Sequence, residues 1–328
     1  MSFICFDLEG PLSPQDNAYE LMRRIPQGDR LFEVISRYDD LLAISGKRKT
    51  YQPGDTLSLI VPFLVFHKIT IEDVERVGED APLTEGAYEL VSDLLDRGWW
   101  VGNITTSYEQ YGTRIAGRAG IPLQNVACTE FHLHEYKLPE ADWETIREIE
   151  RQILPLTPVE DDSRIKRLLD SFFWGRKTSP NIRRLVRAVK PLGGERKLTQ
   201  LRKFAESERV SLDQAVVVGD SITDAAMLEG VKRKGGLAIA FNANEYALTH
   251  ATLGVASRRL SSLRAPLLAW ARGGMGEVEA LVREREKAGG SEEEGYFFWL
   301  EGRDSLEMPL EMHRRLRNLV RQEAAKLG

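Results

Sequence analysis

Cysteine is scarce in this chain, and long apolar runs are absent. Only Cys5 and Cys128 occur among 328 residues, both in apolar, strand-like stretches, so the fold needs no disulfide framework and a reducing compartment suits it. The longest apolar run, Leu57 to Phe66, is interrupted by Ser58 and Pro62. It is too short to span a membrane, and we expect a buried cap helix or an interface there.

A secretion signal and a strong charge of one sign are also lacking. The first residues enter a strand directly, without a basic region or a cleavage site, which predicts a cytoplasmic protein without membrane insertion. The net charge of −5 argues against a nucleic-acid-binding surface. A basic group near the C-terminus is flanked by acids, and we expect it to be a solvent-exposed helix face: Arg314, Arg315, Arg317 and Arg321, with Glu311 and Glu323.

The most informative stretch lies at the N-terminus, where an apolar strand over residues 3–6 runs into Asp7, Glu9 and Gly10. Buried carboxylates cost free energy unless they are paired, and open α/β sheets bind ligands at the carboxyl ends of their strands. A solvated turn is the alternative, because Asp and Gly are common strand terminators. The next segment predicts a helix start with Ser13 as its N-cap and Asp16 closing a capping box.

Two further strands end in polar residues. Thr105, Thr106 and Ser107 follow an apolar strand, and their hydroxyls suit phosphate oxygens, although helix capping explains them equally well. The strand over 214–218 runs into Gly219, Asp220 and later Asp224. Two carboxylates at that spacing can meet at one point and fit Mg²⁺, whereas the alternative is an acidic turn favoured by the helix dipole.

A lysine opens the helix predicted from residue 198 onward. Lys197 lies where a cation opposes the helix macrodipole, so an anionic ligand would explain its position. A surface lysine is the ordinary alternative, and Lys190 competes for the same role.

The order of these pieces resembles the haloacid dehalogenase (HAD) superfamily, in particular its phosphoserine-phosphatase-like branch. The matching residues are Asp7, Thr105, Lys197, Asp220 and Asp224, together with the run from Gly219 to Met227. The resemblance covers about residues 1–12, 85–130 and 190–257. The whole chain also resembles archaeal HAD-type proteins named as energy-converting hydrogenase A subunit R, which points weakly to a hydrogenase-type partner.

The resemblance implies a Rossmann-like α/β core and a Mg²⁺-dependent phosphatase. Asp7 would be the nucleophile, and Mg²⁺ would be held by Asp7, the backbone carbonyl of Glu9, and Asp220, with Asp224 as a ligand or an anchor. Thr105 and Lys197 would bind the phosphoryl oxygens, and Thr106 would add its backbone N–H. The substrate would be a small phosphorylated metabolite.

One residue departs from the family pattern. Glu9 stands where the phosphatases carry the aspartate that protonates the leaving oxygen. A shift of about 1 Å can cost on the order of 10²-fold in rate. Glu9 is therefore either an acid/base fitted to a particular substrate or a sign of slow turnover.

The positions of the motifs divide the chain into four parts. Residues 1–12, 85–134 and 190–257 form the predicted core, 13–84 a helical cap, 135–189 a second helical insertion, and 258–328 a C-terminal helical extension. The aromatic run 296–300 is expected to dock on the core or on another subunit, which leaves a homo-oligomer open. The alternatives to hydrolysis are a weakly active binding subunit and phosphoryl transfer to an acceptor other than water.

Overall fold

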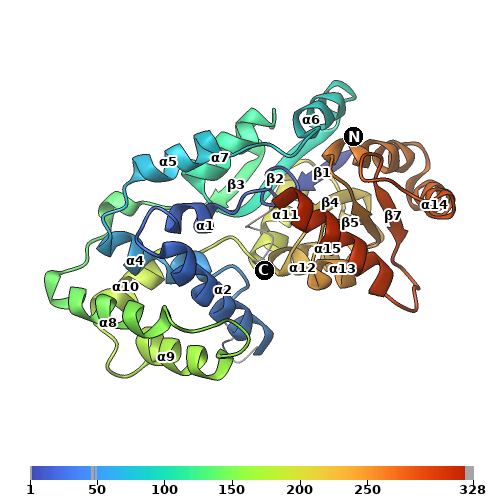
Figure 1. Ribbon diagram of the computed structural model, residues 1–328. Coiled ribbons are helices and arrows are strands. Elements are labelled where there is room, and N and C mark those ends of the chain that lie inside the picture. Colours follow the sequence, from blue (N-terminus) through green and yellow to red (C-terminus); the bar gives the residue numbers. More distant parts are fainter. Residues whose placement is uncertain (1, 46–47, 49, 322–328) are drawn as a thin grey trace.

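A seven-stranded sheet forms the centre of the molecule (Figure 1). The computed structural model describes residues 2–45, 48 and 50–321. Six strands are parallel and β7 is antiparallel, in the order β3-β2-β1-β4-β5-β6-β7. The strands are β1 (Phe3–Phe6), β2 (Trp100–Tyr108), β3 (Val126–Thr129), β4 (Ala215–Gly219), β5 (Leu237–Phe241), β6 (Leu253–Ala256) and β7 (Tyr296–Trp299). This arrangement confirms the predicted α/β fold.

Both faces of the sheet are covered by helices, which explains why its strands read as continuous apolar runs. Ile4 and Phe6 of β1 belong to the larger core cluster, whereas Phe3 and Cys5 point to the smaller one. The helices next to the sheet are α6 (Ala87–Asp96), α7 (Glu109–Arg118), α11 (Glu195–Ser207), α12 (Ala225–Lys232), α13 (Glu245–His250) and α14 (Arg264–Ala288). Two more helices, α1 (Asn17–Met22) and α5 (Ile71–Asp80), pack on one another, and α5 also packs on α7.

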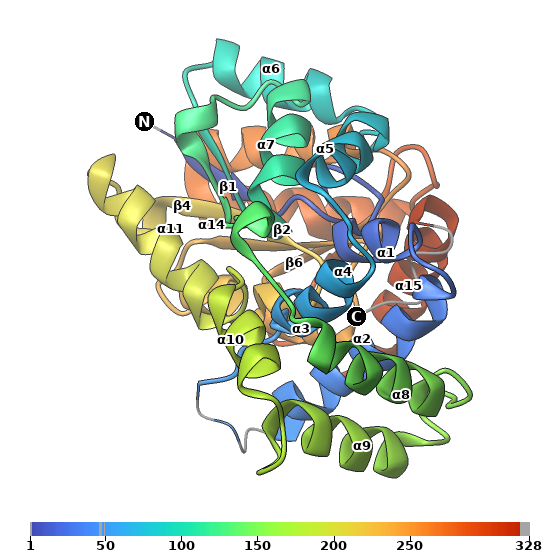
Figure 2. The same cartoon turned by 90° about the vertical axis from the view of Figure 1, so that its left-hand side faces the viewer.

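A second layer of helices is built from two segments that are far apart in the sequence (Figure 2). Its helices are α2 (Gly28–Ser45), α3 (Thr56–Leu59), α4 (Val61–Phe66), α8 (Trp143–Ile153), α9 (Asp162–Trp174) and α10 (Pro180–Ala188). Arg37 on α2 pairs with Asp162 at 2.6 Å, and Tyr38 donates to Asp170 at 2.7 Å. The segments predicted as a cap and a second insertion therefore pack together, and the run 57–66 is buried as two short helices, apart from the half-exposed Val65 and Phe66.

The C-terminal part contributes a strand that the sequence analysis did not anticipate. β7 pairs with β6 and brings Phe297, Phe298 and Trp299 into the core, so the aromatic run docks on the core of its own chain. After β7, α15 (Glu307–Arg321) packs on β6. None of the helices within the described ranges is long and apolar enough to cross a membrane.

The predicted N-cap at Ser13 is wrong. Helix α1 begins at Asn17, and Asp16 caps it by accepting the backbone N–H of Tyr19 at 2.8 Å. Ser13 is fully buried, and its hydroxyl donates to the carbonyl of Pro82 at 2.8 Å. The Ser13 hydroxyl is therefore used in a tertiary hydrogen bond to Pro82 and does not cap the helix.

Candidate active site

The ends of β1, β2 and β4 meet at one edge of the sheet because these neighbouring strands are parallel. Phe6 lies in register with Asn103 of β2 and Val218 of β4. The backbone N–H of Asp7 continues the ladder by donating to the carbonyl of Val218 at 2.8 Å. Asp7 and Asp220 therefore leave adjacent strands at the same level, and both are almost completely buried.

Lys197 lies between two of the predicted carboxylates. It is fully buried in the first turn of α11, and its Nζ is 2.7 Å from Oδ1 of Asp7 and 2.7 Å from Oδ1 of Asp224. Burial alone would lower the pKa of Lys197, but Asp224 and Asp7 raise it above its ordinary value. Lys190, the competing candidate, is exposed. The buried lysine is thus a fixed cation inside the cluster.

Asp224 holds the loop that follows β4. Its Oδ2 accepts the backbone N–H groups of Asp220 at 2.9 Å and Ser221 at 3.2 Å. A side chain on Gly219 would begin 2.5 Å from the Cβ of Asp224, so this close approach requires glycine. Because both oxygens of Asp224 already have partners, its position is that of an anchor for the loop.

The donor set of the cluster suits a hard cation. Asp7, Asp220 and Asp224 each offer a carboxylate oxygen, and these atoms lie within 4.8 Å of one another. Oxygen-only ligands are those that Mg²⁺ prefers. Burial, followed by the charge of Asp224, raises the pKa of Asp7 well above its ordinary value. A cation beside Asp7 would favour its ionised form, so the donor atoms fit the predicted ion.

Gly10 allows the β1 loop to approach Asp220. It has a φ of +102°, a conformation that glycine adopts freely. A Cβ on Gly10 would lie 2.3 Å from Oδ2 of Asp220. The loop that carries the Glu9 carbonyl therefore lies directly against the second carboxylate of the site.

The carboxyl group of Glu9 is held in a fixed orientation beside the cavity described below. Its Oε1 accepts the backbone N–H of Asn17 at 2.7 Å and the hydroxyl of Ser107 at 2.7 Å. Burial, followed by the nearby Asp16, raises the pKa of Glu9 to about 8. This raised pKa favours the protonated carboxyl group, which is the form that a general acid requires.

The two adjacent threonines at the end of β2 face different surroundings. Thr105 is fully buried, and its hydroxyl lies 3.0 Å from that of Ser107 and accepts the Ser107 N–H at 3.1 Å. Thr106 lines the cavity next to Asp7, and its hydroxyl donates to the carbonyl of Leu192 at 3.3 Å. The geometry therefore favours Thr106 over Thr105 for contact with a ligand in the cavity.

A cavity of about 80 Å³ lies between the helical layer and the sheet. Its walls come from the strand ends, from the segment 54–57 with α2, and from α15: Asp7, Glu9, Thr106, Asp220, Gly54, Leu57, Phe32, Asp39, Asp40, Arg317 and Arg321 are among them. The segment around Gly54 closes one side, because its Cα lies so near Thr106 that a Cβ would be 2.8 Å from the Thr106 methyl group.

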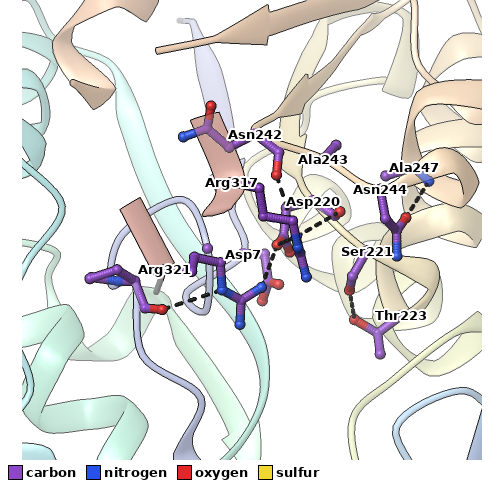
Figure 3. A network of polar contacts seen from close by, with 12 residues as sticks. Asp7, Asp220, Ser221, Thr223, Asn242, Ala243, Asn244, Ala247, Arg317 and Arg321 are labelled. Atoms are coloured by element: carbon purple, nitrogen blue, oxygen red, sulfur yellow. Dashed lines mark hydrogen bonds and ion pairs between the residues drawn. The ribbon is translucent and has the colours of Figure 1, made fainter. Parts of the chain in front are cut away.

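The basic face predicted for the C-terminal helix is wrong for two of its four arginines. Arg317 and Arg321 are only 4% and 7% exposed. Figure 3 shows both reaching Asp220 from α15: Arg317 pairs with Oδ2 of Asp220, and Nη1 of Arg321 lies 2.8 Å from the same oxygen. Arg314 and Arg315 are exposed, with 63% and 58% of their side chains accessible, as expected. Glu323 lies outside the described residues.

The spacing of three residues on α15 indicates this buried face, which was not predicted from the sequence. His313, Arg317 and Arg321 are spaced four apart and so share one side of α15. All three are buried. Charged residues at that spacing are typical of a solvated face. Here Asp220 turns the two arginines inward, and the backbone N–H of Ala243 binds His313.

Comparisons with known proteins agree with this fold. The structure of gene product AF1437 from Archaeoglobus fulgidus is 32% identical over 100% of this chain and 99% of that one, with a TM-score of 0.86. Two phosphoserine phosphatase structures, one a phospho-aspartyl intermediate analogue and one an apo form, are 20% and 18% identical, each over 80% of this chain and 97% of their own, with TM-scores of 0.52 and 0.51. No family model and no curated protein matches the chain.

The archaeal structure and the phosphatase structures support different statements, because their sequence identities to this chain differ. The phosphatase structures match this chain at low identity, which establishes the fold alone. None of the three reported matches carries the hydrogenase subunit name. The archaeal structure matches along the whole chain at an identity that establishes kinship. The chain therefore belongs to the family of the Archaeoglobus fulgidus gene product AF1437, and it has the fold of the haloacid dehalogenase superfamily.

Proposed function

We propose that the protein hydrolyses a small phosphomonoester in a Mg²⁺-dependent reaction that passes through an aspartyl-phosphate on Asp7. One observation carries this proposal: Asp7, Lys197, Asp220 and Asp224 converge, buried, at the carboxyl edge of the sheet. Buried carboxyl groups with a strongly raised pKa, such as Asp7, are typical of functional sites when a specific charged partner lies beside them.

The Mg²⁺ ligands in this proposal are the Asp7 carboxylate, the backbone carbonyl of Glu9 and the Asp220 carboxylate. Asp224 anchors the loop and Lys197, as its hydrogen bonds indicate. When bound, the ion supplies positive charge that keeps Asp7 ionised and attracts the phosphoryl group.

The chemistry is carried by residues of the chain. A carboxylate oxygen of Asp7 attacks phosphorus, and the bond from phosphorus to the ester oxygen breaks as Glu9 gives that oxygen its proton. Glu9, now ionised, takes a proton from water, which then attacks the phosphorus of the aspartyl-phosphate and restores Asp7. Lys197 and the Thr106 hydroxyl hold the phosphoryl oxygens, where charge spreads in the transition state. Thr105, matched by the family pattern, acts indirectly, because its hydroxyl donates to Ser107, which in turn holds Glu9.

The size of the cavity argues for a small substrate. At about 80 Å³ the cavity is small beside ligand pockets of roughly 300–1,000 Å³. Serine phosphate is one member of this class, since two similar structures are phosphoserine phosphatases. The panel of substrates described next therefore includes it beside other small phosphometabolites.

The first test measures inorganic phosphate released by the purified protein with Mg²⁺, from a panel of small phosphometabolites and a generic aryl phosphate. We expect release that requires Mg²⁺ and that disappears in Asp7→Asn, since the amide cannot form the acyl phosphate. Thermal unfolding of the variant shows that its fold is retained. Release that survives in Asp7→Asn would exclude Asp7 as the nucleophile.

The alternatives are less well supported. A weakly active or inactive binding subunit, associated with a hydrogenase, does not call for a nucleophile, a lysine and metal-binding carboxylates at one site. Phosphoryl transfer to another acceptor uses the same first step and differs only in the second. A folded protein that releases no phosphate from any substrate of the panel would favour these alternatives.

A further inference from the structure

The C-terminal helix supplies two cations to the site, and neither of them belongs to the strand-end motifs. Arg317 and Arg321 both bind Oδ2 of Asp220, and the Nε of Arg321 also donates to the carbonyl of Pro14 at 3.2 Å. Both line the cavity beside Asp7. The helix is docked independently by His313, whose Nδ1 accepts the N–H of Ala243 at 2.8 Å. The arginines are thus held against the carboxylate by a rigid element.

Charge within this ion-paired network is already balanced. Asp7, Asp220 and Asp224, when ionised, carry three negative charges, and Lys197, Arg317 and Arg321 carry three positive ones. A Mg²⁺ ion would add two uncompensated positive charges to a buried site. A phosphate dianion alone would add two negative ones. Isolated charge in a buried site is unfavourable, whereas both ions together restore the balance.

Glu9, Asp16, Asp39 and Asp40 also face this cavity. Glu9 accepts from Asn17 and Ser107, Asp16 caps α1, and Asp39 accepts from Tyr51 and Gly54. Whatever charge they carry, one guanidinium fewer on Asp220 removes one positive charge next to the expected Mg²⁺ ligand. The direction of the effect is therefore independent of their ionisation.

We propose that Arg317 and Arg321 couple Mg²⁺ binding at Asp220 to the arrival of a phosphate dianion, so that each ion binds weakly alone and tightly with the other. This inference rests on the proposed function for the metal ligands. It makes the arginines positioning residues for Asp220, and it makes α15 a part of the active site. By linkage, phosphate raises the affinity for Mg²⁺ by the same factor as Mg²⁺ raises the affinity for phosphate.

Titration calorimetry of Mg²⁺, with and without inorganic phosphate, tests the coupling. For the unaltered protein we expect phosphate to tighten Mg²⁺ binding by at least about tenfold, within the usual range of coupling between sites. In Arg321→Gln, Mg²⁺ alone should bind more tightly, on the order of tenfold, and phosphate should add less. Arg321→Lys keeps the charge and should retain the coupling. Arg314→Gln, on the exposed side of the same helix, should behave as the unaltered protein.

Each outcome has a definite meaning. Equal Mg²⁺ affinity with and without phosphate in the unaltered protein would overturn the coupling, even if Arg321→Gln did not fold. Unchanged or weaker Mg²⁺ binding by a folded Arg321→Gln would also overturn it, because the arginine would then support the metal site. These results leave Asp7-dependent phosphate release untouched. A folded, unaltered protein that binds no Mg²⁺ under either condition would instead contradict the proposed function itself.

Discussion

Glu9 differs from aspartate by one methylene group, and its contacts depend on that length. Its Oε1 reaches both the N–H of Asn17, at the start of α1, and the hydroxyl of Ser107, at the end of β2. A shorter side chain on the same backbone would fall short of these two partners by roughly the length of one bond. The geometry therefore favours the view that the site is built around glutamate over the view that Glu9 is a misplaced acid.

Glu9→Asp should accordingly lower turnover. We expect kcat for phosphate release to fall on the order of 10²-fold, because the acid is displaced by about 1 Å from its hydrogen-bonded position. Steady-state kinetics on the best substrate of the panel measures this effect. Calorimetric Mg²⁺ affinity serves as the control and should stay the same, since the expected metal contact of Glu9 is its backbone carbonyl. A variant with equal or higher turnover would show that the carboxyl group is misplaced in the natural protein.

The sequence indicated which residues of the strand-end motifs would lie together, but not the contacts of residues whose position depends on distant partners. Asp7, Lys197, Asp220 and Asp224 come together as their order along the chain suggested. The choice between Thr105 and Thr106 was not available from the sequence, because the pairing of β2 with β3 shifts register after Ile104. Strand alternation cannot be extended through such an irregularity.

Helix α15 depends on a neutral histidine at its centre. His313 is fully buried, and its Nδ1 accepts a backbone N–H, so its Nε2 carries the proton of the neutral ring. Burial, followed by the charge of Arg317, lowers the pKa of His313 to about 3. The docking of α15 therefore loses free energy when the pH falls below the ordinary histidine pKa of 6.5, because only the unfolded chain then takes up the proton.

This argument gives a measurable difference in stability. His313→Asn offers a carbonyl oxygen near the position of Nδ1 and does not titrate. Relative to this variant, the natural protein should lose about 2 kcal/mol of unfolding free energy between about pH 7 and pH 5. Urea unfolding at the two pH values measures both proteins, and other titrating groups cancel in the comparison. Parallel loss of stability in the two proteins would mean that His313 is not held neutral.

The elements that the sequence did not predict are those fixed by tertiary contacts. The run before β7 is acidic and rich in glycine, and β7 has only four residues, so its aromatic pattern fits a docking segment as well as a strand. Its strand conformation comes from pairing with β6. The start of α1 was misplaced for a similar reason, since Ser13 bonds to Pro82, 69 residues away along the chain.

Across the whole molecule, contacts of residues 52–57, in the loop before α3 and its first turn, hold the helical layer against the core. Oε1 of Gln52 accepts the N–H of Glu195 at 2.9 Å, Asp55 pairs with Arg196, and the Tyr108 hydroxyl donates to the carbonyl of Leu57 at 2.5 Å. These contacts hold the layer over the cavity with Asp7 inside. A phosphomonoester larger than the cavity enters only when this loop moves, so its close fit matters for water exclusion and for turnover.

Gly54 tests the importance of that fit. It has a φ of +89°, and a Cβ there would lie 2.8 Å from the Thr106 methyl group and 3.2 Å from that of Thr223. Gly54→Ala must push the loop away by about 1 Å to reach ordinary contact, so we expect kcat to fall on the order of tenfold to 10²-fold. Phosphate-release kinetics on the best substrate measures this effect.

A matched control separates the clash from the backbone strain. Gly98 also has a positive φ, +76°, but nothing lies within 4 Å of its would-be Cβ. Gly98→Ala therefore carries a comparable conformational cost outside the segment 52–57. Its kcat should match that of the natural protein, while its free energy of unfolding falls. If the two variants lose stability equally and neither loses turnover, the loop at Gly54 accommodates a methyl group without disturbing the site. Closure of the helical layer over Asp7 would then not limit the reaction.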